Sequence, residues 1–290
     1  MKTTTFRRYA CILIAAIALF AVFPLNSFAA GNGRVNVDAD ESQNGFVLIN
    51  HVGKSDKKLK VRITRGNSVY NYDLDETGKT EAYPLQLGDG VYKIGVYMHV
   101  TGNSYSMLYS ENIDAKLTSE DAPFLHANQK VDYDSSTEVV KVAKKLCKDL
   151  ETDIEMIDAI YAYVIDNYEY DYKKAKDAIA GKLVGYVPDL DKIYESKKGI
   201  CYDYASMLAA MLRSVGVPAK LVMGYVAPDS VYHAWNEVYI EGEGWVVKQV
   251  HFAGEEWKLM DPTFASAARN SKKINKFIGN GSNYATKYIY

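Results

Sequence analysis

The chain has little cysteine and little histidine, and the placement of both excludes several classes of protein. Among 290 residues there are three cysteines and five histidines. The sequence contains neither a Cys-x-x-Cys pattern nor a His-Glu-x-x-His pattern. Neither a disulfide-stabilised scaffold nor a zinc site is expected, so folding must depend on a hydrophobic core. We therefore predict a protein that uses no metal and no cofactor.

An excess of positive charge is also absent, as are long apolar runs beyond the first thirty residues. Lysine and arginine together number 34, against 36 aspartates and glutamates. This balance argues against a nucleic-acid partner, which would require a basic surface. No later stretch is long and apolar enough to predict a membrane span in the rest of the chain.

The first residues instead have the pattern of a secretory signal peptide. Basic residues precede an apolar run from about Cys11 to Phe23, and the small residues Ser27 and Ala29 follow it. This order of basic, apolar and small residues is typical of a signal peptide that is removed by cleavage. We predict that residues 1–29 form that peptide and that the mature protein is secreted.

Residues 30–118 are predicted to form a small β-sandwich of immunoglobulin-like type. Short runs rich in β-branched and aromatic residues are separated by Gly, Asn and Asp, at 46–49, 59–63, 69–72, 91–97 and 107–109. Regularly spaced strands with turns of this kind are typical of a sandwich. Because no catalytic pattern lies in it, we expect a spacer or binding module, with a cell-surface partner as a candidate role.

Residues 119–290 are predicted to form an α+β domain in which helices pack on an antiparallel sheet. A linker at 118–134 precedes two amphipathic helices, the first at 135–150 and the second beginning near Asp153, which we expect to cap it. An irregular stretch with a short helix follows at 168–188. A third helix begins at Cys201 and ends before Gly216. Strands are expected at 219–225, 231–240, 244–250 and 256–261.

Cys201 is the strongest candidate for a chemical role in the chain. It opens a predicted helix, where unpaired N–H groups and the helix dipole stabilise a negative charge. The same N–H groups can stabilise the oxyanion that forms when a thiolate attacks a carbonyl. Gly199 allows the chain to approach this turn closely. Cys147 lies in a predicted helix and is expected to be a small core residue, which leaves Cys201 as a free thiol.

A histidine and a carboxylate follow Cys201 in an order that suits a catalytic triad. His233 lies on an alternating strand and would act as the base. Asp261, at the end of a later strand, would orient its ring. Glu237 is the competing carboxylate, but it lies four residues along the same strand, roughly 13 Å away. Trp235 shares the strand face of His233 and is a candidate substrate contact.

Tyr170 is a further candidate at the site. A phenol beside the thiol could supply a second donor for the oxyanion, although a packing role would explain this tyrosine equally well. The remaining tyrosines are expected to pack in strands and helices.

These fragments together resemble the transglutaminase-like superfamily. The resemblance rests on residues 199–205, 212–219, 233–238 and 257–263, and it covers about 135–265. It implies a papain-like α+β core with Cys201 as nucleophile, His233 as base and Asp261 as orienter. It also implies an aromatic oxyanion partner upstream of the cysteine, for which Tyr170 is the local candidate. Since the chain lacks the additional domains of calcium-dependent animal members, we predict no calcium requirement.

The sequence therefore predicts a secreted cysteine enzyme that acts on protein or peptide amides through a thioester. Hydrolysis by a peptidase or amidase is favoured, because water needs no dedicated amine site. Crosslinking by a protein-glutamine gamma-glutamyltransferase is the first alternative. A non-catalytic extracellular binding module with a relic triad is the second.

Overall fold

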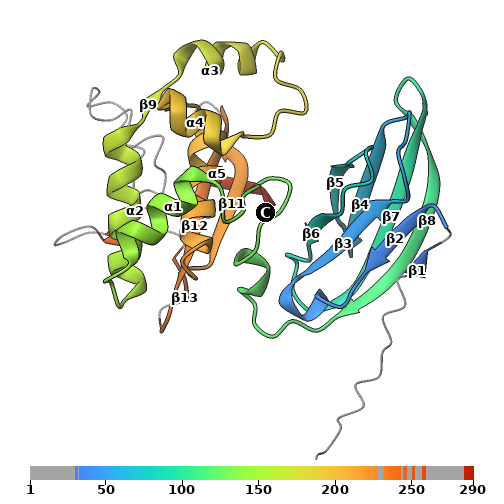
Figure 1. Cartoon of the computed structure of the whole chain (residues 1–290), viewed down its shortest axis with the longest axis horizontal. Coiled ribbons are helices and arrows are strands. Elements are labelled where there is room, and N and C mark those ends of the chain that lie inside the picture. Colours follow the sequence, from blue (N-terminus) through green and yellow to red (C-terminus); the bar gives the residue numbers. More distant parts are fainter. Residues whose placement is uncertain are drawn as a thin grey trace, which may run out of the picture.

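The computed structural model describes residues 30–31, 33–227, 231–242, 244–246, 250–251, 257–258 and 284–290. Within these ranges a region built of strands is followed by helices and a further antiparallel sheet (Figure 1). The predicted α+β class with an all-β first half is confirmed. The predicted signal peptide at residues 1–29 lies outside the described residues.

The all-β region consists of two four-stranded antiparallel sheets. The first has the order β1 (Ala30–Gly31), β2 (Val35–Asp38), β3 (Phe46–His51) and β6 (Glu81–Pro84). The second has the order β5 (Ser68–Leu74), β4 (Leu59–Arg65), β7 (Gly90–Thr101) and β8 (Ser104–Ala115). A short 3₁₀ helix, η1 (Ser42–Asn44), precedes β3.

Alternating side chains explain why these segments form strands with one buried face. In β3, for example, Val47 and Ile49 are buried, while Val61 and Ile63 are buried on β4. Successive strand residues point to opposite sides of a sheet, so this alternation places an apolar row against the opposing sheet. Buried residues of both sheets belong to one continuous cluster.

The described helices of the second region are α1 (Glu138–Cys147), α2 (Asp153–Asn167), α3 (Tyr172–Ile179), α4 (Leu190–Ser196) and α5 (Cys201–Arg213). The first two, which were predicted to be amphipathic, bury apolar residues. Our prediction that Asp153 caps α2 is wrong, because Thr152 is the cap. The Thr152 hydroxyl accepts from the N–H of Glu155, whose carboxylate in turn accepts from the N–H of Thr152. This reciprocal pair of bonds is a capping box, which Asp153 cannot make from inside the first turn.

Helix α5 forms the centre of the α+β region. Its residues from Asp203 to Arg213 are all buried. The helix contacts α1, α2 and α4 as well as the sheet strands β11 (Ala219–Val226) and β12 (Val231–Ile240). A helix with neighbours on every side is fixed firmly, and so is the residue that opens it.

Among its described residues, the second region has one larger sheet and two small ones. The larger antiparallel sheet has the order β13 (Gly244–Val246), β12, β11 and β16 (Tyr284–Ile289). Strands β14 (Val250–His251) and β15 (Trp257–Lys258) form an antiparallel pair. Two short parallel strands, β9 (Glu169–Tyr170) and β10 (Lys198–Gly199), lie immediately before α3 and α5.

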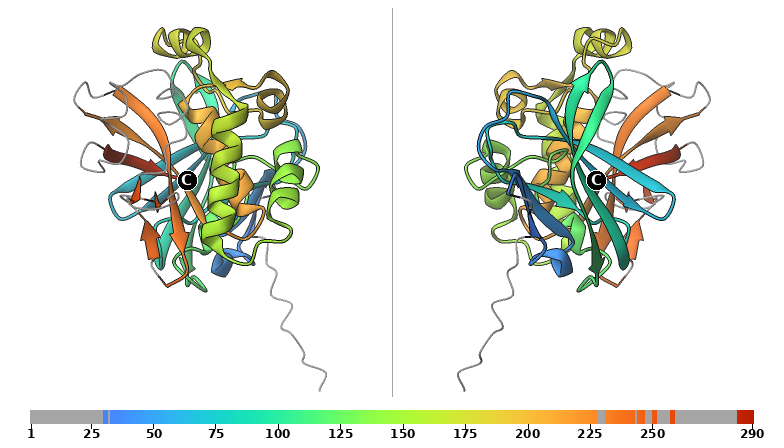
Figure 2. Two further views of the ribbon diagram at one scale, coloured as in Figure 1. Left: turned by 90° about the vertical axis from the view of Figure 1, so that its left-hand side faces the viewer. Right: turned by 90° about the vertical axis from the view of Figure 1, so that its right-hand side faces the viewer.

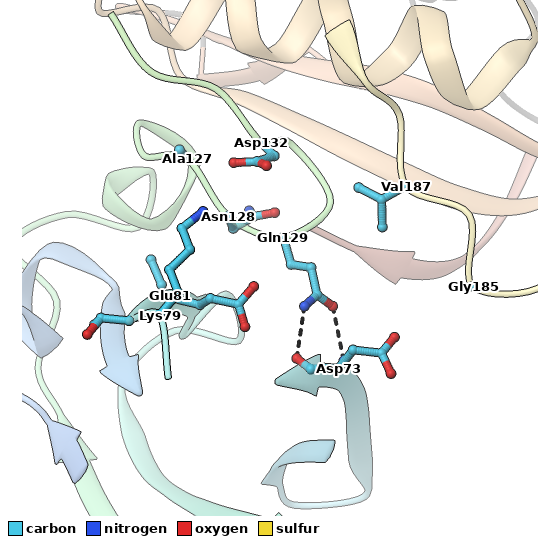
Figure 3. A pocket seen from close by; sticks show the side chains of 11 residues that line it. Asp73, Lys79, Glu81, Ala127, Asn128, Gln129, Asp132, Gly185 and Val187 are labelled. Atoms are coloured by element: carbon cyan, nitrogen blue, oxygen red, sulfur yellow. Dashed lines mark hydrogen bonds between the residues drawn. The ribbon is translucent and has the colours of Figure 1, made fainter. Parts of the chain in front are cut away.

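The predicted linker is more ordered and more buried than its composition indicates. It includes a 3₁₀ helix, η2 (Ala122–Phe124), whose three residues are buried, and a bridge between Asn128 and Val131. Figure 3 shows Gln129 above β5, where its side-chain amide makes two hydrogen bonds to the backbone of Asp73. The linker therefore packs against the β-sandwich.

Strand β16 joins the two regions of the molecule. It lies beside β11 in both views of Figure 2, and its Tyr288 ring packs edge-on against Tyr70 of the β-sandwich. The buried Arg213 guanidinium donates to three backbone oxygens, those of Ala219, His126 and Tyr290, at 2.7–2.8 Å. Burial lowers the pKa of Arg213 to about 10, so the side chain stays charged at neutral pH.

Candidate active site

Cys201 is the first residue of α5, as predicted, and its thiol is free. Ile200 precedes it in an extended conformation and serves as the N-cap position. The first N–H groups of a helix have no partner within the helix. At the start of a helix such groups can stabilise a thiolate or an oxyanion.

Gly199 is required by the close approach that the sequence predicted. A Cβ atom at this position would lie 2.8 Å from the Cβ of Asp203, which is closer than two such carbon atoms can approach without displacement. The absence of a side chain at Gly199 therefore allows β10 to meet the first turn of α5.

We expect Gly199→Ala to disturb the nucleophilic turn through this contact. Pushing Asp203 aside should cost about 1–3 kcal/mol of stability, as overpacking usually does, and lower the rate of Cys201 alkylation about 10-fold. Chemical denaturation and iodoacetamide labelling would measure both. Lys198→Ala is the matched control, because the Lys198 side chain forms an exposed ion pair with Glu169, and its removal should change either quantity little. Alkylation of Gly199→Ala at the rate of the unchanged protein would contradict this expectation.

The carboxylate of Asp203 organises the turn that carries Cys201. This side chain is fully buried, with 0 % of its surface exposed. Its Oδ2 accepts from the N–H of Ile200 at 2.8 Å and from Lys174 Nζ at 2.6 Å. Its Oδ1 accepts from the hydroxyl of Tyr186 at 2.6 Å. One buried group thus connects the nucleophilic turn with α3 and with the loop that follows α3.

The charge of Lys174 has a chemical consequence for the nucleophile. An unpaired carboxylate in the first turn of α5 would oppose the formation of a thiolate on Cys201 by repulsion. Lys174 forms an ion pair with Asp203, and 22 % of the lysine side chain is exposed. The pair neutralises the carboxylate, so the dipole and the N–H groups of the helix remain available to stabilise a negative charge on sulfur.

His233 and Cys201 line the same cavity, which has a volume of about 370 Å³. His233 lies on β12, opposite Gly224 of β11, and only 7 % of its surface is exposed. Because α5 packs against β11 and β12, the start of the helix and this part of the strand border one space. The structure therefore brings together the predicted nucleophile and the predicted base.

Aromatic and aliphatic side chains form most of the cavity wall. The lining residues are Lys130, Ala178, Leu183, Gly185, Tyr186, Ile200, Cys201, Tyr202, Met223, Tyr232, His233, Ala234 and Tyr290. Burial raises the pKa of Tyr232 to about 12, and it also raises the pKa values of Tyr186 and Tyr202. These phenols stay protonated at neutral pH and can donate hydrogen bonds. The Tyr202 hydroxyl has no partner among the described residues.

Neither Tyr170 nor Trp235 lines this cavity. Tyr170 lies on β9, which pairs with β10 at Gly199, and its ring packs edge-on against Tyr172. Trp235 is only 1 % exposed and packs against Tyr284, a placement that does not support a substrate contact. Asp261 lies outside the described residues. The roles given to these three residues stay predictions.

Glu237, the carboxylate that competed with Asp261, has a partner of its own. It pairs across the strands with Lys220, whose Nζ lies 3.5 Å from its Oε2, and both side chains are largely buried. This ion pair accounts for Glu237 without a catalytic role.

In the described part of the chain, no group of three or more histidine, cysteine, aspartate or glutamate side chains could hold a metal ion. The expectation that the protein needs neither metal nor cofactor stays a prediction. Among the same residues, no helix combines the length and the apolar character that crossing a bilayer would require.

Sequence reasoning missed several residues of the site. Asp203 could have been recognised, because an acidic residue at the third helical position is a signal for an N-terminal cap. Lys174, Tyr186 and Lys130 carry no such signal. They reach the site only because α3, the loop after it and the linker fold over the start of α5.

Comparison with known proteins finds similarity over a part of the chain that includes this site. Residues 140–249 match the family model described as the transglutaminase-like superfamily, and this range includes Cys201 and His233. The uncharacterized protein YebA of Bacillus subtilis (strain 168) is 27 % identical over 60 % of this chain and 26 % of its own length. Kyphoscoliosis peptidase of Mus musculus is 28 % identical over 48 % of this chain and 20 % of its own.

The chain thus spans about a quarter or less of the length of these curated relatives. Among solved structures, a proposed cysteine protease from Cytophaga hutchinsonii is similar at 17 % identity, with a TM-score of 0.36. That match covers 83 % of this chain and 81 % of the other.

Proposed function

Because the chain contains a domain of the transglutaminase-like superfamily at residues 140–249, we propose that it is a cysteine-dependent enzyme that attacks amide carbonyls of proteins or peptides. The observation that carries this proposal is the cavity shared by Cys201, at the start of α5, and His233, on β12. A thiol and an imidazole around one solvent-accessible space are the minimum that nucleophilic catalysis by cysteine requires.

The reaction proceeds through two acyl transfers. His233 takes the thiol proton of Cys201, and the sulfur attacks the amide carbon, so that the carbonyl oxygen becomes an oxyanion. The N–H groups of the first turn of α5 stabilise that oxyanion. His233 then gives its proton to the leaving amine, the C–N bond breaks and a thioester remains. Asp261, which lies outside the described residues, is proposed from the sequence to orient the ring of His233.

The second transfer decides between hydrolysis and crosslinking. Water attacking the thioester releases an acid and restores the thiol, whereas a primary amine forms a new amide. We favour hydrolysis, because water reaches the thioester without a dedicated binding site. The N-terminal pattern of basic, apolar and small residues supports the further proposal that the enzyme acts outside the cell.

The choice between the two acceptors can be measured directly. The protein is incubated with a casein or peptide substrate and an excess of a fluorescent primary amine, and products are followed by mass spectrometry. Hydrolysis predicts new acid groups, either cleaved peptide bonds or glutamate in place of glutamine, with little amine incorporated. Amine incorporation as the main product would assign the enzyme to crosslinking. If Cys201→Ala formed the same products at the same rate, the proposal would be wrong.

A further inference from the structure

The cavity that holds Cys201 and His233 contains one lysine in an otherwise apolar and aromatic wall. Apart from the two reactive residues and Lys130, its lining in the described part of the chain consists of glycine, aliphatic side chains, methionine and tyrosine. A cation in such surroundings is costly unless an anion accompanies it. Lys130 therefore requires an explanation that packing does not supply.

Lys130 is held in place by its own backbone. The Asn128 side chain accepts from the N–H of Lys130 at 2.9 Å, and the carbonyl of Lys130 accepts from the hydroxyl of Ser206 at 3.0 Å. Ser206 belongs to α5, the helix that Cys201 begins. The preceding Gln129 is fixed to the backbone of Asp73, as Figure 3 shows. These hydrogen bonds fix the backbone of Lys130 relative to α5, which begins at Cys201, and relative to the β-sandwich.

The two carboxylates whose charges act on Lys130, those of Asp73 and Glu81, already have other partners. Asp73 forms an ion pair with Lys60. Glu81 accepts hydrogen bonds from the Tyr83 hydroxyl at 2.9 Å and from the N–H of Asp75 at 2.8 Å.

Lys130 itself takes part in none of the ion pairs found among the described residues. Its Nζ lies 6.0 Å from the centre of the Tyr72 ring. Burial lowers the pKa of Lys130, and the negative charges of Asp73 and Glu81 offset this effect only in part, as expected for a cation whose charge is not fully compensated.

We propose that Lys130 binds a carboxylate of the substrate, so that the enzyme selects peptides with a carboxylate close to the attacked amide. This inference rests on the proposed function and names the substrate class of the same site. A cavity of about 370 Å³ is at the small end of ligand pockets, with room for one side chain and the adjoining peptide unit. The carboxylate belongs either to an acidic side chain or to a free chain end.

The experiment compares substrates that differ only in this charge. Short peptides carry a glutamate or a glutamine beside the cleavable amide, and each is made with a free or an amidated C-terminus. Values of kcat/KM are measured for the unchanged protein, Lys130→Met and Lys130→Arg. Lys79→Met is the matched control, because Lys79 lines a neighbouring cavity between the linker and the β-sandwich and is not among the residues around Cys201. Thermal unfolding verifies that each variant is folded.

The unchanged protein should prefer a carboxylate-bearing peptide by about 10- to 100-fold, as expected for a charge-assisted contact that is partly shielded from water. Lys130→Met should remove that preference by lowering kcat/KM for the carboxylate-bearing peptides far more than for the neutral ones, whereas Lys130→Arg should keep much of the preference. The peptide whose kcat/KM falls most in Lys130→Met shows whether the bound carboxylate belongs to the acidic side chain or to the free C-terminus. Equal loss on all four peptides would overturn the inference, because Lys130 would then act on the nucleophile.

A binding measurement separates this inference from the proposed function. In a Cys201→Ala background, which cannot form a thioester, calorimetry should detect tighter binding of the carboxylate-bearing peptide, and Lys130→Met should abolish the difference. A protein that binds the carboxylate but cleaves no amide would disprove the proposed function alone. Cys201-dependent cleavage without any preference for charge would disprove only the role of Lys130.

Discussion

Alanine in place of Cys201 is expected to lower amide cleavage by about 10⁴-fold or more, because no other group can form the acyl intermediate. His233→Ala should have an effect of similar size, because the loss of one member of a catalytic unit removes most of the activity that the whole unit supplies. Initial rates on a cleavable peptide measure both. Alkylation by iodoacetamide at mildly acidic pH gives an independent reading: Cys201 should react much faster than free N-acetylcysteine, and His233→Ala should slow the reaction sharply.

Two variants serve as matched controls for this pair. Cys147 is the other free thiol of the described chain, and burial raises its pKa. Cys147→Ala should therefore leave cleavage and alkylation unchanged. His99 lies on β7 of the β-sandwich, where its ring packs against Tyr105. His99→Ala should likewise leave cleavage and alkylation unchanged. If Cys201 reacted no faster than the free thiol in the presence of His233, the catalytic interpretation would fail.

The second large effect is expected at Asp203. Asp203→Asn should reduce the free energy of unfolding by about 3 kcal/mol or more, because removing one partner of a buried ion pair leaves the other charge uncompensated. The turn before Cys201 should shift as well, since the N–H of Ile200 depends on the same carboxylate. We therefore expect a fall in kcat of about 10-fold or more, measured on protein that denaturation curves show to be folded.

An exposed ion pair provides the comparison for Asp203. Asp177 and Lys182 lie 2.8 Å apart, with 36 % and 67 % of their side chains exposed. Asp177→Asn should cost less than about 1 kcal/mol, as surface pairs usually do. Tyr186→Phe is the milder change within the buried cluster, because it removes two hydrogen bonds, one to Asp203 and one from Lys174, and leaves the charges paired. Stability of Asp203→Asn within 1 kcal/mol of the unchanged protein would contradict the role assigned to this carboxylate.

The sequence predicted well those elements that local signals specify. The start of α5 at Cys201 and its end before Gly216 follow from the periodicity and from the glycine, whose φ is +89°. The alternating strands of the β-sandwich and β12 were predicted for the same reason. The cap of α2 was misplaced by one residue, since Thr152 and Asp153 are both residue types that favour this position.

Elements that depend on distant partners were missed. Strand β16 has no strong pattern of its own and becomes a strand through pairing with β11, about sixty residues earlier. Strands β9 and β10 have two residues each and pair across α3 and α4. The residues of the site divide in the same way. Sequence motifs predicted Cys201 and His233, whereas Lys130, Lys174 and Tyr186 could be recognised only in the folded structure.

The shared anchor at Asp203 limits how the specificity of the proposed enzyme can be engineered. The segment from α3 to Tyr186 forms one side of the cavity, and Lys174 and Tyr186 attach it to the carboxylate of Asp203. The same carboxylate fixes the turn that precedes Cys201. A library that varied these two positions to admit larger substrates would damage catalysis in the same step. Ala178 and Leu183 border the same space with apolar side chains. They are the positions at which selectivity could be redesigned independently of turnover.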